Sequence, residues 1–341
     1  MTQSLDYQMA NAEWYRSDSS TPPPDLLKPT AGRAVRNWLR GCLPEPDVAG
    51  KTVVLYARQG LRKMSAWAGM FSEFHSVVGA LAYGEAHGAA AVRVDFRSAL
   101  YVDAARGPNW WTYFFERDLM PIQDRSSRGE VHLDRSLAKY GRHGGFCDVV
   151  NGTTPYLYPM TYGVPRADVH RLVASHIHVR PSILDEVARA TAGSVTPGAY
   201  VVGVHYRGTD STRRPGLMTD NQTTRVSYQA YAEEVRRALD DAAASSYHVF
   251  VASDEIEFLE FMQKAFGDRV VCSESSPRVH ASALPIHLDR ALPVSNYLKG
   301  ASALVDCLRL AATDYLVKGR SNLSDASLAF NPRLPYSFCL R

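Results

Sequence analysis

The chain has 341 residues, of which 45% are hydrophobic and 21% charged; these proportions are typical of a soluble globular protein and exclude a largely disordered chain. Its 38 basic and 35 acidic residues leave a formal net charge of +3, so the composition does not indicate a nucleic-acid binder. The sequence contains no run of about 18 apolar residues and no apolar segment near its start. We therefore expect a cytoplasmic protein without a membrane span, built from two domains.

The first half begins with a predicted strand–helix–strand unit. Residues 1–50 contain few periodic apolar positions, and we expect them to form an arm around the first domain. The apolar run 52–56 predicts a buried strand, and apolar residues spaced three and four apart over 74–82 predict a helix. His87-Gly88 ends that helix, and residues 91–96 predict the next strand. The helix is long enough to return the chain for parallel pairing of the two strands.

The region between residues 100 and 195 is less regular. Residues 109–115 are densely aromatic, and we favour packing in the core over stacking on a sugar. The polar, glycine-rich segment 121–147 predicts a loop, and residues 167–192 predict mainly helix. Three histidines near the end of this region, His170, His176 and His178, lack a carboxylate or cysteine pattern. We therefore expect no metal site there.

Strands and helices alternate regularly after Thr196-Pro197-Gly198, where we place the domain boundary. The predicted domains are residues 1–195 and 196–341. In the second domain we expect strands over residues 200–206, 249–253, 269–272 and 314–317, and helices over residues 228–239, 256–266 and 301–311. This alternation predicts an α/β fold with a doubly wound parallel sheet.

Polar residues follow three of these predicted strands. His205 and Arg207 end the first, Asp254 ends the second, and Ser321 and Asn322 follow the last, immediately before an apolar helix start. Ligands bind beyond the carboxyl ends of strands in open α/β sheets. Arginine can grip phosphate oxygens bidentately, and the N–H groups at a helix N-terminus suit phosphate. Together these residues predict a cleft for a nucleotide diphosphate, although each one alone also fits a surface role.

The same strand ends resemble motifs of the fucosyltransferase superfamily, which includes nodulation and eukaryotic α-1,6-fucosyltransferases and the protein O-fucosyltransferases. Four segments carry the resemblance: residues 69–75 (GMFSEFH), 202–210 (VGVHYRGTD, similar to an H-x-R-x-x-D strand end), 249–254 (VFVASD) and 304–324. The resemblance extends over about residues 52–95 and 200–332.

This resemblance implies a GT-B fold, in which two Rossmann-like domains with parallel sheets face a cleft. It implies an inverting, metal-independent sugar transfer from a nucleotide sugar, usually GDP-fucose, with no other cofactor. It assigns the donor pocket to six residues: Arg207 for the β-phosphate and the departing diphosphate, Ser321 and Asn322 for the phosphates, His205 and Asp306 for guanine and ribose, and Asp254 for the border of the pocket. A carboxylate such as Asp306 can accept two N–H groups from guanine, which uracil does not offer.

The catalytic base is expected in the first domain. The chain has Arg207-Gly208 where the α-1,6 enzymes carry two arginines, and Arg213-Arg214-Pro215 where they place a carboxylate. We therefore favour Glu73, in the turn that enters the first long helix, as the base that takes the proton of the acceptor. The alternative is that Glu73 merely favours the helix dipole. Three further residues are reserve candidates near the acceptor: His75, Asp95 and Glu116.

The sequence leaves three functions open. The leading hypothesis is transfer of fucose from GDP-fucose to a glycan, peptide or small-molecule acceptor. The second keeps the fold and uses another GDP- or UDP-sugar. The third is a catalytically silent module that binds a nucleotide or a glycan.

Overall fold

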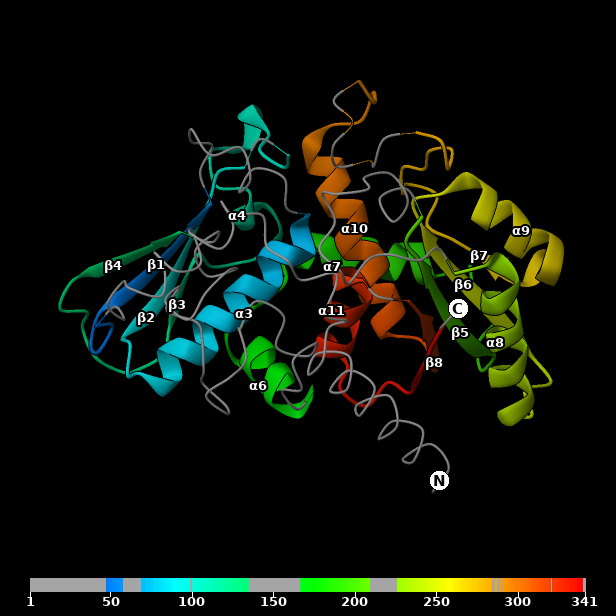
Figure 1. The fold of residues 1–341 in the computed structure, drawn as a ribbon, viewed down its shortest axis with the longest axis horizontal. Coiled ribbons are helices and arrows are strands. Elements are labelled where there is room, and N and C mark those ends of the chain that lie inside the picture. Colours follow the sequence, from blue (N-terminus) through cyan, green and yellow to red (C-terminus); the bar gives the residue numbers. More distant parts are fainter. Residues whose placement is uncertain are drawn as a thin grey trace, which may run out of the picture. The chain divides into compact units, whose positions relative to one another are not determined.

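The computed structural model describes residues 47–57, 69–98, 100–134, 166–208, 226–283, 286, 289, 291–319 and 321–339. The chain divides between Arg180 and Pro181 into two compact units, which we call the N-terminal and C-terminal units. Each unit is a mixed α/β structure built on its own sheet (Figure 1). The predicted fold class, two Rossmann-like units with parallel sheets, is confirmed. The boundary at residues 195–196 stays a prediction, and most of the predicted arm lies outside the described residues.

The N-terminal unit has a four-stranded sheet in the order β3-β2-β1-β4. Strands β1 (Thr52–Ala57), β2 (Ala91–Phe96) and β4 (Glu130–Asp134) run parallel, and β3 (Leu119–Pro121) is antiparallel to β2. Helix α3 (Met70–Ala86) connects β1 and β2 as the apolar spacing predicts, and α6 (Arg166–His176) packs against α3.

The prediction of a loop over residues 121–147 is wrong where β4 forms. Residues 130–134 alternate polar and apolar side chains, and they pair in parallel with β1 at the edge of the sheet. Val131 and Leu133 are half-buried, and His132 between them is exposed. An edge strand needs apolar side chains on one face only, so its sequence pattern is weak within a polar segment.

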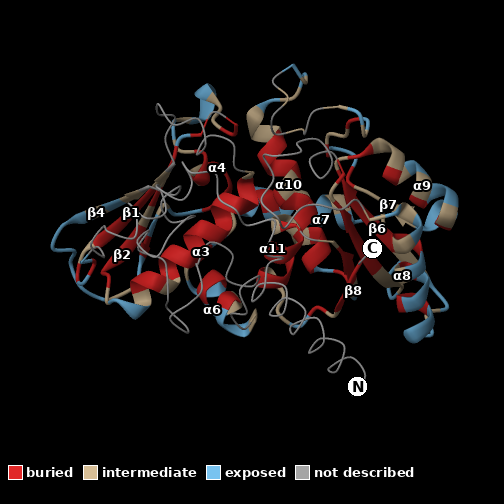
Figure 2. Ribbon diagram, in the orientation of Figure 1, coloured by how far each residue is buried: buried red, intermediate tan, exposed pale blue. Residues whose placement is uncertain are grey.

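Aromatic side chains fill the core of the N-terminal unit. Helix α4 (Trp111–Phe114) and its flanking residues bury Trp110 and Phe115, and Trp111 stacks on Phe115 with ring centroids 4.0 Å apart. Phe74 of α3 lies 6.4 Å from the ring of Trp111. The prediction that this aromatic cluster packs in the core is confirmed. Figure 2 shows α3 buried along most of its length.

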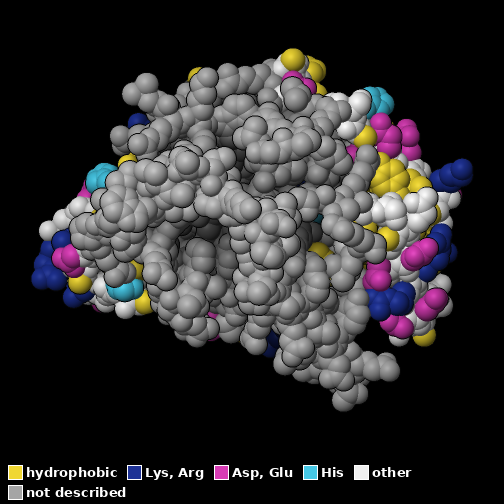
Figure 3. All heavy atoms as spheres, viewed as in Figure 1, with side chains coloured by type: hydrophobic (Ala, Val, Ile, Leu, Met, Phe, Trp, Pro, Cys, Tyr) yellow, Lys and Arg dark blue, Asp and Glu magenta, His cyan; other side chains and the backbone are white. Residues whose placement is uncertain are grey.

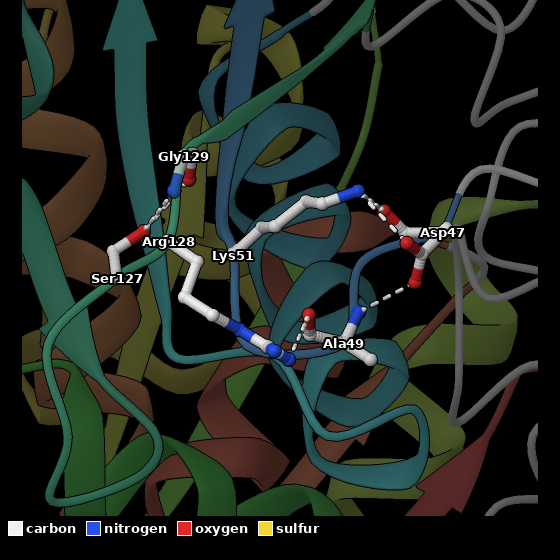
Figure 4. A network of polar contacts seen from close by, with 6 residues as sticks. All are labelled: Asp47, Ala49, Lys51, Ser127, Arg128 and Gly129. Atoms are coloured by element: carbon white, nitrogen blue, oxygen red, sulfur yellow. Dashed lines mark hydrogen bonds and ion pairs between the residues drawn. The ribbon is translucent and has the colours of Figure 1, made fainter.

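A polar network holds the start of β1 beside the start of β4 (Figure 4). Lys51 Nζ lies 2.8 Å from Asp47 Oδ2, and Arg128 Nη2 donates to the carbonyl of Ala49 over 3.4 Å. Gly50 has a φ of +66°, and a Cβ there would lie 2.7 Å from Arg128 Nη2. Glycine is therefore favoured by the left-handed backbone conformation, whereas the exposed end of the Arg128 side chain could shift to accept a Cβ.

The C-terminal unit has a five-stranded, wholly parallel sheet in the order β7-β6-β5-β8-β9. The strands are β5 (Tyr200–Tyr206), β6 (Tyr247–Ser253), β7 (Val270–Val271), β8 (Tyr315–Lys318) and β9 (Tyr336–Phe338). The first four match predicted strands. The three-residue β9 at the edge was not predicted, because it is too short to show a pattern.

Helices cover both faces of this sheet. Helices α8 (Tyr228–Asp241) and α9 (Ile256–Phe266) lie on one face, and α10 (Asn296–Ala311) and α11 (Asn322–Phe330) lie on the other (Figure 1). Helix α7 (Pro181–Thr191) packs against α10. The outer surface over α8 and α9 carries both acidic and basic side chains (Figure 3). Among the described residues, no helix is long and apolar enough to cross a membrane.

Candidate nucleotide-binding site

The strand order of the C-terminal unit reverses between β5 and β8. From β5 the chain passes outward through α8 to β6 and through α9 to β7. It then returns across the other face through α10 to β8, on the opposite side of β5, and continues outward to β9. Ligands of open α/β sheets bind at such a switch point, beyond the carboxyl ends of the two strands. The carboxyl ends of β5 and β8 therefore define the candidate site.

The structure brings four predicted residues to this edge. His205 pairs in register with Lys318 of β8 and is buried, and Arg207 follows β5 directly and is half-buried. Ser321 is the N-cap of α11, where its Oγ accepts the N–H of Leu323 over 3.3 Å, and Asn322 is the first residue of that helix. An arginine and a capped helix N-terminus thus follow the two strands at the switch point, and both favour an anion.

A buried ion pair fixes α11 to β8 beneath the helix N-terminus. Lys318 is the last residue of β8 and has no exposed surface, and its Nζ lies 2.7 Å from Oδ1 of Asp325. Asp325 lies in the first turn of α11. The Lys318 ammonium also lies 4.7 Å from the centroid of the Phe338 ring on β9. These contacts set the position of the helix start relative to the strand end.

Asp254 and its neighbour Glu255 lie where β6 ends, on the other side of β5. Asp254 Oδ1 accepts the N–H of Gly208 over 3.0 Å, so it contacts the residue next to Arg207. Glu255 is fully buried and accepts a hydrogen bond from the Tyr228 hydroxyl. Glu255 was missed by the sequence analysis. The sequence shows an acidic pair, Asp254-Glu255, directly after β6. It does not show that Glu255 contacts Gly208, because the two residues are far apart in the chain.

Asp306 lies in α10 as part of a buried polar network. Its two carboxylate oxygens accept hydrogen bonds from Ser273 Oγ at 2.5 Å and Ser276 Oγ at 2.8 Å. Burial raises the pKa of Asp306, and these hydrogen bonds and the charges of Arg278 and Arg309 partly oppose that shift. The two serines come from the segment after β7, which the sequence analysis did not connect with α10.

Arg309 extends this network towards the sheet. Its Nη1 donates to Ser273 Oγ over 2.8 Å, and its guanidinium lies 4.1 Å from the centroid of the Phe250 ring on β6. Burial lowers the pKa of Arg309. The network therefore joins α10, the segment after β7 and the central part of the sheet.

The candidate residues of the N-terminal unit lie in different environments. Glu73 is in the first turn of α3 and fully buried, and its Oε2 accepts the indole N–H of Trp110 over 2.9 Å. His75 is buried with its ring edge-on to Phe74 at 5.7 Å.

The other two candidates of this unit are more accessible. Asp95, near the end of β2, is paired with Arg97 at 2.6 Å. Glu116 is exposed, and its backbone N–H donates to the carbonyl of His178 over 2.9 Å. Within the described ranges, the structure contains no group of three or more His, Cys, Asp or Glu side chains arranged to hold a metal ion.

No protein-family model matches the sequence, and no curated protein matches it. Among solved structures, the chain is similar to NodZ α-1,6-fucosyltransferase soaked with GDP-fucose, at 17% identity and a TM-score of 0.47 over 83% of this chain and 94% of that chain. It is similar to fucosyltransferase NodZ from Bradyrhizobium at 17% identity and a TM-score of 0.44, over 86% of this chain and 96% of that one.

A further similar structure is that of a point mutant of Arabidopsis thaliana FUT1 in complex with GDP, at 11% identity and a TM-score of 0.45 over 98% of this chain and 78% of that chain. These similarities describe the fold.

Proposed function

We propose that the protein is an inverting, metal-independent glycosyltransferase that transfers fucose from GDP-fucose to an acceptor. The observation that supports this proposal most directly is the pairing of Arg207 and the α11 N-terminus at the β5–β8 switch point. A nucleotide diphosphate carries its negative charge between the base and the sugar, and this edge supplies an arginine and a helix dipole for that charge.

Arg207 acts on the leaving group in this proposal. Breaking the bond between the sugar and the β-phosphate leaves negative charge on the diphosphate. A guanidinium can donate two parallel N–H bonds to phosphate oxygens and stabilise that charge as it develops. Ser321 and Asn322 place the first turn of α11 beside the same phosphates, and His205 borders the nucleoside.

Asp306 contacts guanine in this proposal. An ionised carboxylate offers about four lone-pair positions, of which Ser273 and Ser276 use one on each oxygen. The remaining positions can accept the N1–H and N2–H groups of guanine. This contact favours GDP over UDP, because uracil presents no such pair of donors.

Glu73 is the proposed general base. The acceptor hydroxyl must lose a proton as it attacks the anomeric carbon from the face opposite the diphosphate. Glu73 lies in the first turn of α3, the helix that follows β1, so it belongs to the carboxyl edge of the N-terminal sheet. The hydrogen bond from Trp110 holds its carboxylate in one orientation.

Nucleotide-dependent stabilisation tests the proposed function. A ligand that binds only the folded state stabilises it by about 2.7 kcal/mol at a concentration of 100 Kd. We expect a rise in melting temperature with GDP, a smaller one with UDP and none with ADP, together with fucose transfer or slow hydrolysis of GDP-fucose. A larger response to UDP would favour the alternative donor. A response to GDP without turnover of any nucleotide sugar would favour a silent binding module, and no response to any nucleotide would refute the site.

A further inference from the structure

The turn after β5 is pressed against Glu255. A Cβ built on Gly208 would lie 2.7 Å from Glu255 Cβ and 2.8 Å from Glu255 Cδ, closer than real Cβ atoms approach other atoms. Gly208 is not among the glycines of positive φ. Glycine is therefore required at this position by the neighbouring side chain and not by the backbone conformation.

The turn that carries Asp254 and Glu255 is itself firmly held. Val279 donates its N–H to the carbonyl of Asp254 over 2.9 Å, and its own carbonyl accepts the N–H of Ile256 over 3.1 Å. The hydroxyl of Ser253 accepts the N–H of Glu255 over 3.1 Å. Gly208 thus packs against a rigid turn, and its backbone N–H donates to Asp254 Oδ1 of that turn.

Tyr228, the first residue of α8, fixes the Glu255 side chain in this turn. Its hydroxyl donates to Glu255 Oε1. Its ring packs edge-on against Tyr206 and Phe258, with centroids 5.3 Å away in both cases. Because Glu255 has no exposed surface, its carboxylate depends on such protein groups to hold its orientation.

We propose that Asp254, Glu255 and Tyr228 are positioning residues that fix the Arg207–Gly208 peptide for binding of the donor diphosphate; this inference rests on the proposed function. Arg207 lies beyond the last paired residue of β5, so the sheet ladder does not hold it. Its backbone is set instead by the groups that clamp Gly208. Small displacements of a group that contacts the reacting part of a substrate cost large factors in rate.

The experiment compares GDP affinity by calorimetry in wild type, Glu255→Gln and Tyr228→Phe. We expect each variant to bind GDP about tenfold more weakly, because Tyr228→Phe removes the hydroxyl that donates to Glu255 and Glu255→Gln replaces the accepting carboxylate by a neutral amide. Glu257→Gln and Tyr247→Phe are matched controls with wild-type affinity. Glu257 lies two residues further along and bonds His280 and Ala281, and Tyr247 lies at the opposite end of β6.

A double-mutant cycle separates positioning from general weakening of the fold. In an Arg207→Ala background, Glu255→Gln should cause no further loss of GDP affinity, because it acts through the arginine. A full additional tenfold loss would overturn the inference. So would wild-type affinity in both single variants while the wild type binds GDP. Wild-type protein that binds no nucleotide would instead refute the proposed function, and the inference with it.

Gly208→Ala provides a second, steric test. This variant should bind GDP weakly and melt at a lower temperature. Adding Glu255→Gly, which removes the Cβ of residue 255 as well as its carboxylate, should restore the melting temperature by removing the clash but should not restore GDP affinity. Recovery of both properties, or of neither, would contradict a positioning role for Glu255.

Discussion

Trp110 and Glu73 are hydrogen-bonded inside the N-terminal unit, where the indole Nε1 donates to Glu73 Oε2 over 2.9 Å and both side chains are fully buried. The glutamate that we propose as the base is thus oriented by an aromatic residue of the core. Its replacement by glutamine preserves this contact, because the amide oxygen still accepts the indole N–H.

Glu73→Gln should lower turnover by about 10²–10⁴-fold, because an amide cannot take the proton of the acceptor. GDP affinity and the melting temperature should remain those of wild type. Initial rates of fucose transfer and calorimetric GDP titration measure the two effects. Glu85→Gln, at the other end of α3, is the control with normal turnover. Full turnover of Glu73→Gln would show that Glu73 is not the base and serves only as a hydrogen-bond acceptor for Trp110.

Arg207→Ala should lower turnover by about 10²–10³-fold, the effect of removing one preorganised donor to developing negative charge. Arg207→Lys should recover only part of this loss, because an ammonium lacks the planar pair of donors. Arg333→Ala changes an exposed arginine that precedes β9 and should retain wild-type rates. A near-wild-type rate for Arg207→Ala would exclude the β5–β8 edge as the diphosphate site.

Turnover should be the same in excess EDTA as in added Mg²⁺ or Mn²⁺. In our proposal, Arg207 and the N-terminus of α11 provide the positive charge that other transferases obtain from a metal ion held by an Asp-x-Asp pair. The sequence contains no such pair. Steady-state rates after exhaustive chelation measure this directly. Activity that disappears in EDTA and returns with a divalent cation would contradict the prediction.

Asp306→Asn should change how stability depends on pH. Burial raises the folded-state pKa of Asp306 above its ordinary value of 3.8, so the folded state holds this proton more tightly than the unfolded state does. The resulting stabilisation is fully present below pH 3.8 and is lost as the pH rises through the raised pKa.

Urea unfolding from about pH 4 to pH 8 tests this prediction. The free energy of unfolding of wild type should fall relative to that of Asp306→Asn as the pH increases across this range. A difference between the two proteins that is constant with pH, or that grows in favour of wild type, would show that Asp306 titrates normally or is held ionised.

Asp325→Asn should destabilise the protein by about 3–5 kcal/mol, because it leaves the Lys318 ammonium buried without its counter-charge. Lys318→Met combined with Asp325→Leu should recover most of this loss. Glu234→Gln, which breaks the exposed ion pair with Arg237, should cost less than about 1 kcal/mol. Chemical denaturation measures all three variants. A cost for Asp325→Asn as small as that for Glu234→Gln would show that the Lys318 charge is solvated.

Much of the fold could be predicted because its central strands are continuous apolar runs. Residues 91–96 and 200–206 form strands with the predicted bounds, and Ser227 and Ser321 cap helices as serines before apolar helix starts commonly do. The edge strand β4 was not predicted, because one buried face leaves a weak pattern in a polar segment.

The candidate site, like the fold, could be predicted only in part. Arg207 and Ser321 could be placed together, because parallel strands bring their carboxyl ends to one edge. The contact between Gly208 and Glu255 could not, since it depends on the packing of two turns that only the folded chain brings together. For the same reason, the sequence did not reveal that Ser273 and Ser276 already bond Asp306.

The central place of β5 has a consequence for exchange with solvent. This strand pairs with β6 on one side and β8 on the other, and helices cover both of its faces. Its amide hydrogens should therefore exchange with solvent only when the unit unfolds extensively. His205 belongs to this strand, so its amide should be among the slowest to exchange in the C-terminal unit.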